Sequence, residues 1–134
     1  MDSYINILKK MNKIAANNGD VPVSCIIIKD NVIISKAYNM REKYKNPILH
    51  AEFIAIKKAA KKLNRWNLSD CTLISTLKPC NMCTEIIKES KIKNIYYILD
   101  KNKVVNNKII VKKIECKEEE YFEKEIRSFF VNKR

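Results

Sequence analysis

The sequence predicts an α/β fold in which helices cover both faces of a central mixed sheet of five strands. Three observations support this prediction. Apolar residues recur at helical spacing in several segments, β-rich runs occur in others, and the two kinds of segment alternate along much of the chain. Strands that alternate with helices are typical of a three-layer αβα arrangement.

Residues 3–17 are expected to form an amphipathic helix, because apolar residues recur there at helical spacing. The predicted apolar face consists of Tyr4, Ile7, Leu8, Met11, Ile14 and Ala15. Polar and flexible residues then end the helix, and these are Asn17, Asn18, Gly19 and Asp20.

The next part of the chain predicts a hairpin and a second helix. Two β-rich runs, residues 21–28 and 32–38, are joined by a short polar segment, Lys29-Asp30-Asn31, which favours a hairpin. A basic, proline-containing loop is expected over residues 40–47. A helix follows over residues 49–64, with an apolar face of Phe53, Ile56, Ala60 and Leu63.

The second half of the chain supplies three further strands and two helices. Strands are expected over residues 71–76, 95–99 and 109–114, and a helix over residues 80–89 follows Pro79. A last helix begins at Glu118, with acidic residues near its start and basic ones near its end, as the helix dipole favours. Its apolar stripe consists of Phe122, Ile126, Phe129 and Phe130.

Length and composition limit the possible classes of protein. A chain of 134 residues, of which 46% are hydrophobic, is expected to fold as a single domain, residues 1–134. Residues 1–13 contain no unbroken apolar run, and no stretch approaches the ~18 apolar residues of a membrane span. We therefore expect a soluble, cytoplasmic protein without a membrane partner.

Cysteine and glycine usage narrows the chemistry further. The 5 cysteines are an odd number in a chain without an export signal, so metal binding or burial is favoured over a disulfide framework. Gly19 is the only glycine, which excludes the glycine-rich loops of Walker and dinucleotide-binding motifs. ATP- and NAD-dependent chemistry on standard scaffolds is therefore not expected.

The net charge of +12 has two interpretations. Clustered basic residues bind polyanions, so the charge favours a nucleic-acid partner. Only 4 of the 27 basic residues are Arg, however, and Lys, Asn and Ile are abundant throughout, as an AT-rich coding bias would produce. The charge alone does not decide between these two interpretations.

The residues expected to carry chemistry lie in two short motifs. His50, the only histidine, begins the motif His-Ala-Glu at the start of a predicted helix, and residues 79–83, Pro-Cys-Asn-Met-Cys, lie at a later strand-to-helix junction. Three nitrogen and sulfur ligands with one open position are typical of catalytic zinc, whereas structural sites usually have four protein ligands. We therefore predict that His50, Cys80 and Cys83 bind one zinc ion per subunit.

The spacing of these residues suits a metal site. Cys80 and Cys83 lie one helical turn apart, so both sulfur atoms can reach one ion from the same side. Both motifs open helices, whose free N–H groups and positive dipole ends favour thiolate over thiol.

Glu52 lies two residues after the predicted histidine ligand. Zinc lowers the pKa of a water ligand from ~15.7 to ~7, and a nearby carboxylate can take up the released proton. The predicted reaction is hydrolytic deamination of a nucleobase, in which Glu52 protonates the ring nitrogen and then the amine, and ammonia leaves.

Each part of this pattern has a simpler interpretation when taken alone. A lone Cys-x-x-Cys is often a buried or redox pair, a lone histidine usually lies at the surface, and Glu52 would complement a helix dipole. The combination of His-x-Glu with Pro-Cys-x-x-Cys is much rarer and is the signature of zinc deaminases. The other cysteines fall in or beside strands, where burial is expected, and these are Cys25, Cys71 and Cys116.

With these motifs, the chain resembles the bacterial tRNA adenosine deaminases of the zinc-dependent cytidine and deoxycytidylate deaminase superfamily. These enzymes convert the wobble adenosine of an anticodon to inosine. The resemblance implies a cytidine-deaminase-like fold, a homodimer with an RNA surface across both subunits, and the anticodon loop of tRNA as partner, with no DNA partner. It rests on Val21-Pro22-Val23, Asn39, His50-Ala51-Glu52, residues 76–83, Asp100 and Phe129-Phe130.

The resemblance also implies substrate-binding roles for Asn39, Val23, Ala51 and Asp100. Asn39 would hydrogen-bond the purine ring, and Val23 would pack against its face. Asp100 would contact the RNA backbone beside the flipped base, and the terminal helix would help to hold the anticodon loop. Structural roles are the alternatives: Asn39 could end a strand, Asp100 could cap a turn, and at least one phenylalanine of the terminal helix could pack in the core.

The sequence departs from the family pattern directly before the metal-binding segment and on both sides of Asp100. Lys78 stands where the family usually has Glu, and Tyr97-Ile98-Leu99 replaces a glycine-containing turn. Residues 101–107 replace a loop of small residues. These differences do not touch the predicted zinc ligands, but they bear on the RNA contacts implied around Asp100.

Two other functions share part of these features. Small-molecule deaminases of guanine, cytosine or deoxycytidylate have the same fold and signature, although cytidine deaminases often use Cys where this chain has His50. The terminal helix, Asn39 and the basic charge favour tRNA. A catalytically inactive zinc-binding subunit that docks RNA is the third possibility, but such proteins commonly lose the glutamate, and Glu52 is present.

Overall fold

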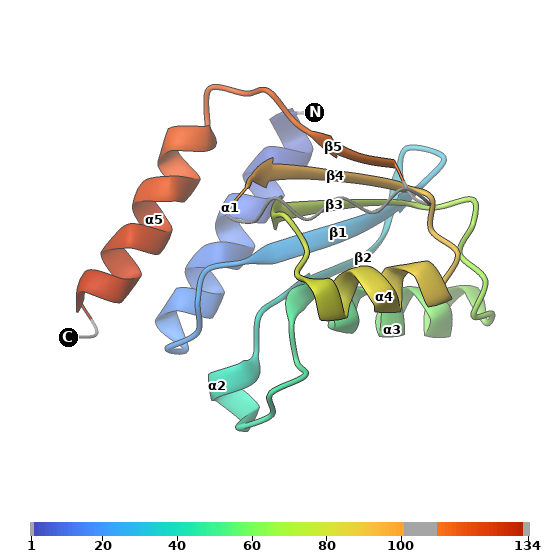
Figure 1. Ribbon diagram of the computed structural model, residues 1–134, viewed down its shortest axis with the longest axis horizontal. Coiled ribbons are helices and arrows are strands. Elements are labelled where there is room, and N and C mark those ends of the chain that lie inside the picture. Colours follow the sequence, from blue (N-terminus) through green and yellow to red (C-terminus); the bar gives the residue numbers. More distant parts are fainter. Residues whose placement is uncertain (1, 101–109, 133–134) are drawn as a thin grey trace.

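Five strands form one mixed sheet in the order β2-β1-β3-β4-β5 (Figure 1). The computed structural model describes residues 2–100 and 110–132. β1 is antiparallel to β2 and β3, whereas β3, β4 and β5 run parallel, so the predicted mixed five-stranded sheet is confirmed. The strands are β1 (Ser24–Lys29), β2 (Val32–Tyr38), β3 (Thr72–Leu77), β4 (Asn94–Leu99) and β5 (Ile110–Lys113).

The predicted hairpin connects β1 and β2 by a turn of two residues. Asp30 and Asn31 both have positive φ angles, 52° and 63°, and Lys29 pairs with Val32 on either side of them. Positive φ at both central positions is the geometry of a type I′ turn, which Asp and Asn tolerate better than most residues.

Helices cover both faces of the sheet, which confirms the three-layer αβα arrangement (Figure 1). α3 (Ala51–Leu63) and α4 (Asn81–Glu89) pack on one face, and α1 (Asp2–Asn17) and α5 (Glu119–Asn132) on the other. Alternate residues of one strand serve the two cores, because side chains of a strand point to opposite faces in turn. Within the described residues, every helix is too short or too polar to cross a membrane.

The buried face of α1 differs from the predicted one. Ile14 is 44% exposed, although the periodicity placed it on the apolar face, whereas Ile5 and Asn12 are buried. The buried series passes through polar Asn12, whose side-chain amide donates to a carboxylate oxygen of Glu125 on α5 at 3.0 Å. Because a polar residue interrupts the stripe, apolar spacing alone identified the wrong edge of the helix.

The buried face of α3 also differs from the prediction. Ala51, Ala55 and Ala59 are buried on the sheet, whereas Phe53 and Ile56 are only partly buried at its margin. Alanine side chains let the helix approach the sheet closely, and the hydroxyl of Ser35 on β2 donates to the backbone carbonyl of Ala55 at 2.8 Å. The largest apolar residues of this helix therefore do not mark its buried face.

A one-turn helix, α2 (Arg41–Tyr44), lies within the segment that was predicted as a loop. Its N-terminal amides are held by Asp20, a buried residue that precedes β1. The Asp20 carboxylate accepts hydrogen bonds from the backbone N–H groups of Glu42 at 2.6 Å and Lys43 at 3.2 Å. This long-range cap satisfies donors that a helix leaves without partners in its first turn.

The three cysteines outside the two motifs have different degrees of burial. Cys25 and Cys71 are buried among the hydrophobic residues on the α3 side, as predicted. Cys116 is only partly buried and packs at the edge of the core on the α1 side.

We predict that Asp20→Ala destabilises the protein, because the substitution leaves two amides of α2 without their acceptor. The expected loss is about 1–3 kcal/mol of unfolding free energy, measured by urea denaturation. Asp2→Ala is the matched control, since Asp2 is exposed in the first turn of α1. Equal unfolding free energies for the two variants would contradict the capping role.

Candidate active site

The predicted metal ligands come from the N-terminal ends of two adjacent helices. His50 immediately precedes α3 and Cys80 immediately precedes α4, and both have extended backbone angles, as residues at a helix N-cap usually do. Cys83 lies in the first turn of α4 and is fully buried. The structure therefore brings together residues that are 30 and 33 positions apart in the sequence.

The distances between the three ligand atoms suit a single metal ion. His50 Nδ1 lies 3.8 Å from Cys80 Sγ and 3.5 Å from Cys83 Sγ, and all three atoms lie within 4.8 Å of one another. Tetrahedral zinc with bonds of roughly 2.0–2.3 Å holds its ligand atoms at about such separations. The donor set of one imidazole and two thiols is also one that zinc prefers.

The electrostatics of the ligands also fit a bound cation. Burial, together with the nearby charge of Arg41, lowers the pKa of His50, which keeps the imidazole neutral as a ligand must be. Burial raises the pKa of the Cys83 thiol, and the charges of Glu52 and Cys80 raise it further. Thiolates that lie beside a carboxylate need a compensating positive charge, which a divalent cation between them would provide.

Glu52 is a buried carboxyl group next to the ligand cluster. Its side chain is 4% exposed, and burial raises its pKa to about 7, against the lowering effect of a hydrogen bond with Cys83. A carboxyl group with a pKa near neutrality can both accept and release a proton during one reaction cycle.

A cavity of about 180 Å³ opens beside the ligand cluster and Glu52. Three of the four predicted substrate-binding residues, Val23, Asn39 and Ala51, line this metal-site cavity, but Asp100 does not. The remaining wall includes residues that sequence reasoning did not assign to the site. These are Val21, Arg41, Leu77 and Lys78.

Asn39 is held firmly at the edge of the metal-site cavity. Its backbone N–H donates to the carbonyl of Val23 at 2.9 Å, and its side-chain oxygen accepts from the N–H of Arg41 at 3.3 Å. Within the described part of the chain, the side-chain nitrogen of Asn39 donates to no protein group. This nitrogen is therefore available to a molecule in the cavity.

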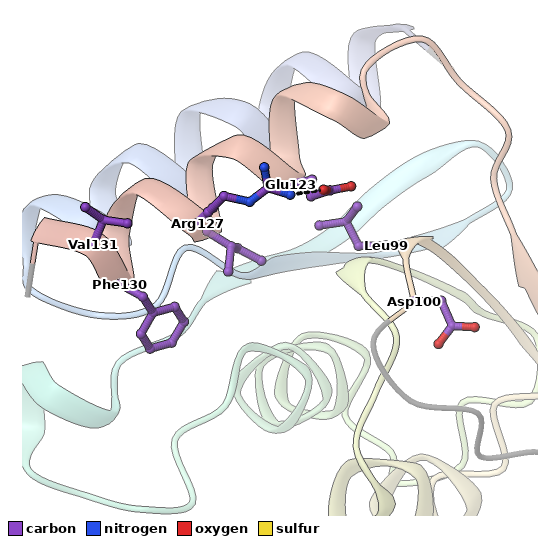
Figure 2. Close-up of a pocket in the computed structure, with 7 residues that line it drawn as sticks. Leu99, Asp100, Glu123, Arg127, Phe130 and Val131 are labelled. Carbon is purple, nitrogen blue, oxygen red and sulfur yellow. Dashed lines mark hydrogen bonds and ion pairs between the residues drawn. The ribbon is translucent and has the colours of Figure 1, made fainter.

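Asp100 lines a separate groove of about 450 Å³ between the end of β4 and α5, the α5 groove (Figure 2). Figure 2 shows Arg127 and Glu123 paired on α5 along one side of the groove and Asp100 on the other. Phe130 lies at one end of the groove and is 48% exposed, so this ring of the predicted apolar stripe is not core. The groove is therefore partly apolar and partly charged.

A middle hollow of about 340 Å³ adjoins the other two. It shares Asn39 and Arg41 with the metal-site cavity and Phe130 with the α5 groove. Phe129, which is partly buried, also lines it and meets Phe130 edge to face at 5.4 Å. The three hollows thus follow one another along the surface.

Two of the unassigned residues left a signal in the sequence. Arg41 is one of only 4 arginines and lies two positions after Asn39 in the basic loop. Lys78 directly precedes the metal-binding segment and follows a strand, a position where side chains often line a site. Arg41 was missed, because its position is not chemically distinctive without the fold. Lys78 was noted as a departure from the family pattern, but only the fold shows that it lines the cavity.

Comparison with known proteins gives relatives of this chain. It is 43% identical over 99 residues to the tRNA-specific adenosine deaminase of Aquifex aeolicus (strain VF5), a match that covers 73% of the chain and 66% of that protein. The chain therefore spans just under two thirds of the length of this relative and about half that of several streptococcal ones.

Solved structures with similar folds are also deaminases. A tRNA:A34 deaminase structure aligns with a TM-score of 0.76 and 20% identity, over 84% of the chain and 98% of that structure. A guanine deaminase from Bacillus subtilis aligns with a TM-score of 0.69 and 23% identity, over 95% and 93% respectively. These two likenesses concern the fold.

A family-level match agrees with the geometry of the site. The family described as the cytidine and deoxycytidylate deaminase zinc-binding region matches residues 1–99, which is well over half of the chain. The chain belongs to this family of zinc-binding deaminases.

Proposed function

We propose that this protein is a zinc-dependent deaminase that converts adenosine to inosine at the wobble position of a tRNA anticodon by hydrolysis. The observation that carries this proposal is the buried carboxyl of Glu52 beside the His50, Cys80 and Cys83 cluster, in a cavity that also presents Asn39. The Aquifex relative, a tRNA-specific adenosine deaminase, supports the choice of substrate.

His50, Cys80 and Cys83 would hold one zinc ion per subunit. Zinc at such a site supplies a Lewis acid and makes hydroxide available at neutral pH. Glu52 takes a proton from the attacking water and delivers it to the ring nitrogen beside the amine-bearing carbon. It then takes the proton of the hydroxyl newly attached to that carbon and passes it to the amine, so that the C–N bond breaks, ammonia leaves, and a carbonyl remains on the ring.

The metal-site cavity suits a single base. Its volume of about 180 Å³ is below the roughly 300–1,000 Å³ of most ligand pockets, so the sugar and phosphates of a substrate lie outside it. Asn39 donates its side-chain N–H to the purine ring, Val23 packs against the ring face, and small Ala51 leaves space beside Glu52. A base flipped out of an RNA loop meets these requirements at low cost, because it is not paired.

The neighbouring hollows suit the nucleotides on either side of the target. Single-stranded RNA is bound by aromatic rings that stack on bases and by basic groups that contact phosphates. Phe129 and Phe130 with Arg41 in the middle hollow, and Phe130 with Arg127 in the α5 groove, offer both kinds of contact. The Asp100 carboxylate would contact the RNA backbone by accepting from a ribose hydroxyl. The net charge of +12 then acts on phosphates, and a homodimer in the cytoplasm would extend this surface across two subunits.

A small-molecule purine deaminase is the second candidate, favoured by the fold likeness to guanine deaminase. The two candidates differ in their response to RNA, because a tRNA enzyme with weak nucleoside activity is inhibited by added tRNA. An enzyme on free bases is not. An inactive RNA-docking subunit, the third candidate, would release no ammonia from any of these substrates.

Glu52→Gln is expected to lower kcat by at least about 10²-fold while zinc stays bound, because the variant keeps the side-chain shape but cannot carry the proton. Single-turnover assays measure the rate, and elemental analysis measures zinc. Glu89→Gln, at the exposed end of α4, is the matched control and should leave both unchanged. An active Glu52→Gln enzyme would show that another group moves the protons.

Cys83→Ala is expected to lose both zinc and activity, because only two protein ligands remain. Cys116→Ala is the matched control, since Cys116 is partly buried against the hydrophobic core under α1 and α5, on the face of the sheet opposite α3 and α4. Zinc content of the two purified variants checks the prediction. Full zinc occupancy in Cys83→Ala would remove this residue from the metal site.

Incubation with an unmodified arginine tRNA carrying an ACG anticodon is expected to produce inosine at the first anticodon position. Sequencing then reads G in place of A at this base alone. A tRNA with G at the same position serves as the control. No conversion of any tRNA, together with deamination of a free purine, would replace the proposed function by the small-molecule one.

A further inference from the structure

Lys78 and Asp100 occupy equivalent positions at the carboxyl ends of two neighbouring strands. Each directly follows one of two neighbouring parallel strands, β3 and β4, and the backbone N–H of Lys78 donates to the carbonyl of Leu99 at 2.8 Å. Ligands of α/β proteins commonly bind beyond the carboxyl ends of the strands. Lys78 lines the metal-site cavity, and Asp100 lines the α5 groove.

The ammonium group of Lys78 lies in a nearly enclosed environment. Its side chain is 10% exposed, and Nζ lies 3.9 Å from Asp100 Oδ2 and 5.5 Å from the centre of the Tyr97 ring. The distance to Asp100 exceeds the ~2.7–2.9 Å of a charge-assisted hydrogen bond. Asp100 is held in place by the hydroxyl of Tyr97 at 3.4 Å.

This ammonium group is incompletely satisfied by the protein. Among the described residues it has no hydrogen-bond acceptor, although an ammonium carries three donors. Solvent still reaches the Lys78 ammonium. In the described segments, only one side-chain nitrogen or oxygen is both fully buried and without a hydrogen-bond partner, and that atom is Asn12 Oδ1. A partly desolvated cation that solvent can still reach favours an anionic acceptor.

The position of Lys78 and Asp100 relative to the metal-site cavity indicates which anion the ammonium would bind. The metal-site cavity takes only a base, so the phosphates of a bound nucleotide lie at its wall, where Lys78 is one of two basic residues with Arg41. A phosphate at the wall of the metal-site cavity can reach the Lys78 ammonium from the cavity side, while Asp100 lies 3.9 Å from the same ammonium on the side of the α5 groove. Lysine binds phosphate as a point charge without a fixed donor geometry, which suits a phosphate approaching from the side opposite Asp100.

We propose that Lys78 binds the phosphate of the nucleotide whose base occupies the metal-site cavity, and so selects nucleotides over free bases and nucleosides. Asp100 and the Tyr97 ring hold the ammonium in place for this contact. The inference rests on the proposed deaminase function, since it names the group that Lys78 recognises on the substrate of the same site. The phosphate belongs either to a mononucleotide or to an RNA chain.

Binding is measured with zinc-loaded Glu52→Gln protein, so that ligands are not turned over. The ligands are adenosine, its 5′- and 3′-monophosphates, and an anticodon stem-loop RNA. We expect a phosphate-bearing ligand to bind about tenfold or more tightly than adenosine, and Lys78→Met to abolish this preference. For the RNA, Lys78→Met should also reduce the slope of log affinity against log salt by about 1.

Two further variants separate a phosphate contact from a structural effect. Lys78→Arg keeps the charge and should restore most of the preference. Lys62→Met removes an exposed charge at the far end of α3 and should change nothing. All variants should keep their zinc and their affinity for adenosine.

The outcomes also separate this inference from the proposed function. A Lys78-dependent preference for a monophosphate, with no tRNA conversion by the wild type, would keep the inference and make the substrate a mononucleotide. Inosine in tRNA with no effect of Lys78→Met would keep the function and overturn the inference. Equal affinity for ligands with and without phosphate, including no measurable affinity for any, would also overturn it.

Discussion

The site depends on two helices whose N-terminal ends meet on one face of the sheet. α3 and α4 pack side by side there, and His50 and Cys80 are the residues directly before them (Figure 1). The positive ends of both helix dipoles then point toward the sulfur atoms and Glu52, where negative charge gathers. Alanines on the buried face of α3 allow this helix to lie close to the sheet, so packing and electrostatics support the same geometry.

The strands and their order of appearance were predictable from local pattern, and the two motifs singled out three side chains that the structure brings together, His50, Cys80 and Cys83. Other details were not predictable. The buried face of α1 includes Asn12, whose side-chain nitrogen donates to Glu125 far away in the sequence. α2 depends on Asp20, which lies 22 residues before the first amide it accepts from. A pattern of apolar residues contains no information about such long-range polar partners.

Some residues of the candidate site lie where the sequence analysis expected them, and others do not. Val23, Asn39 and Ala51 were assigned through family resemblance, and all three line the metal-site cavity. Asp100 was assigned in the same way, yet it lines the α5 groove, because it follows β4, whereas Lys78 and the metal-binding segment follow the neighbouring β3. Lys78 was noted from the sequence as a departure from the family pattern, but its place beside Asp100 follows from the register of β3 and β4.

Chemistry and selection therefore occupy different parts of this surface. Under the proposed function, the ligand cluster and Glu52 carry out the chemistry, and nothing in their geometry senses the sugar or phosphate. In the same proposal the small cavity admits one base, and residues at its wall and beyond would discriminate between a free base, a nucleotide and an RNA. Proteins of one fold can accordingly act on different substrates while they keep one metal site. In this chain Lys78, Arg41 and Phe130 hold those outer positions.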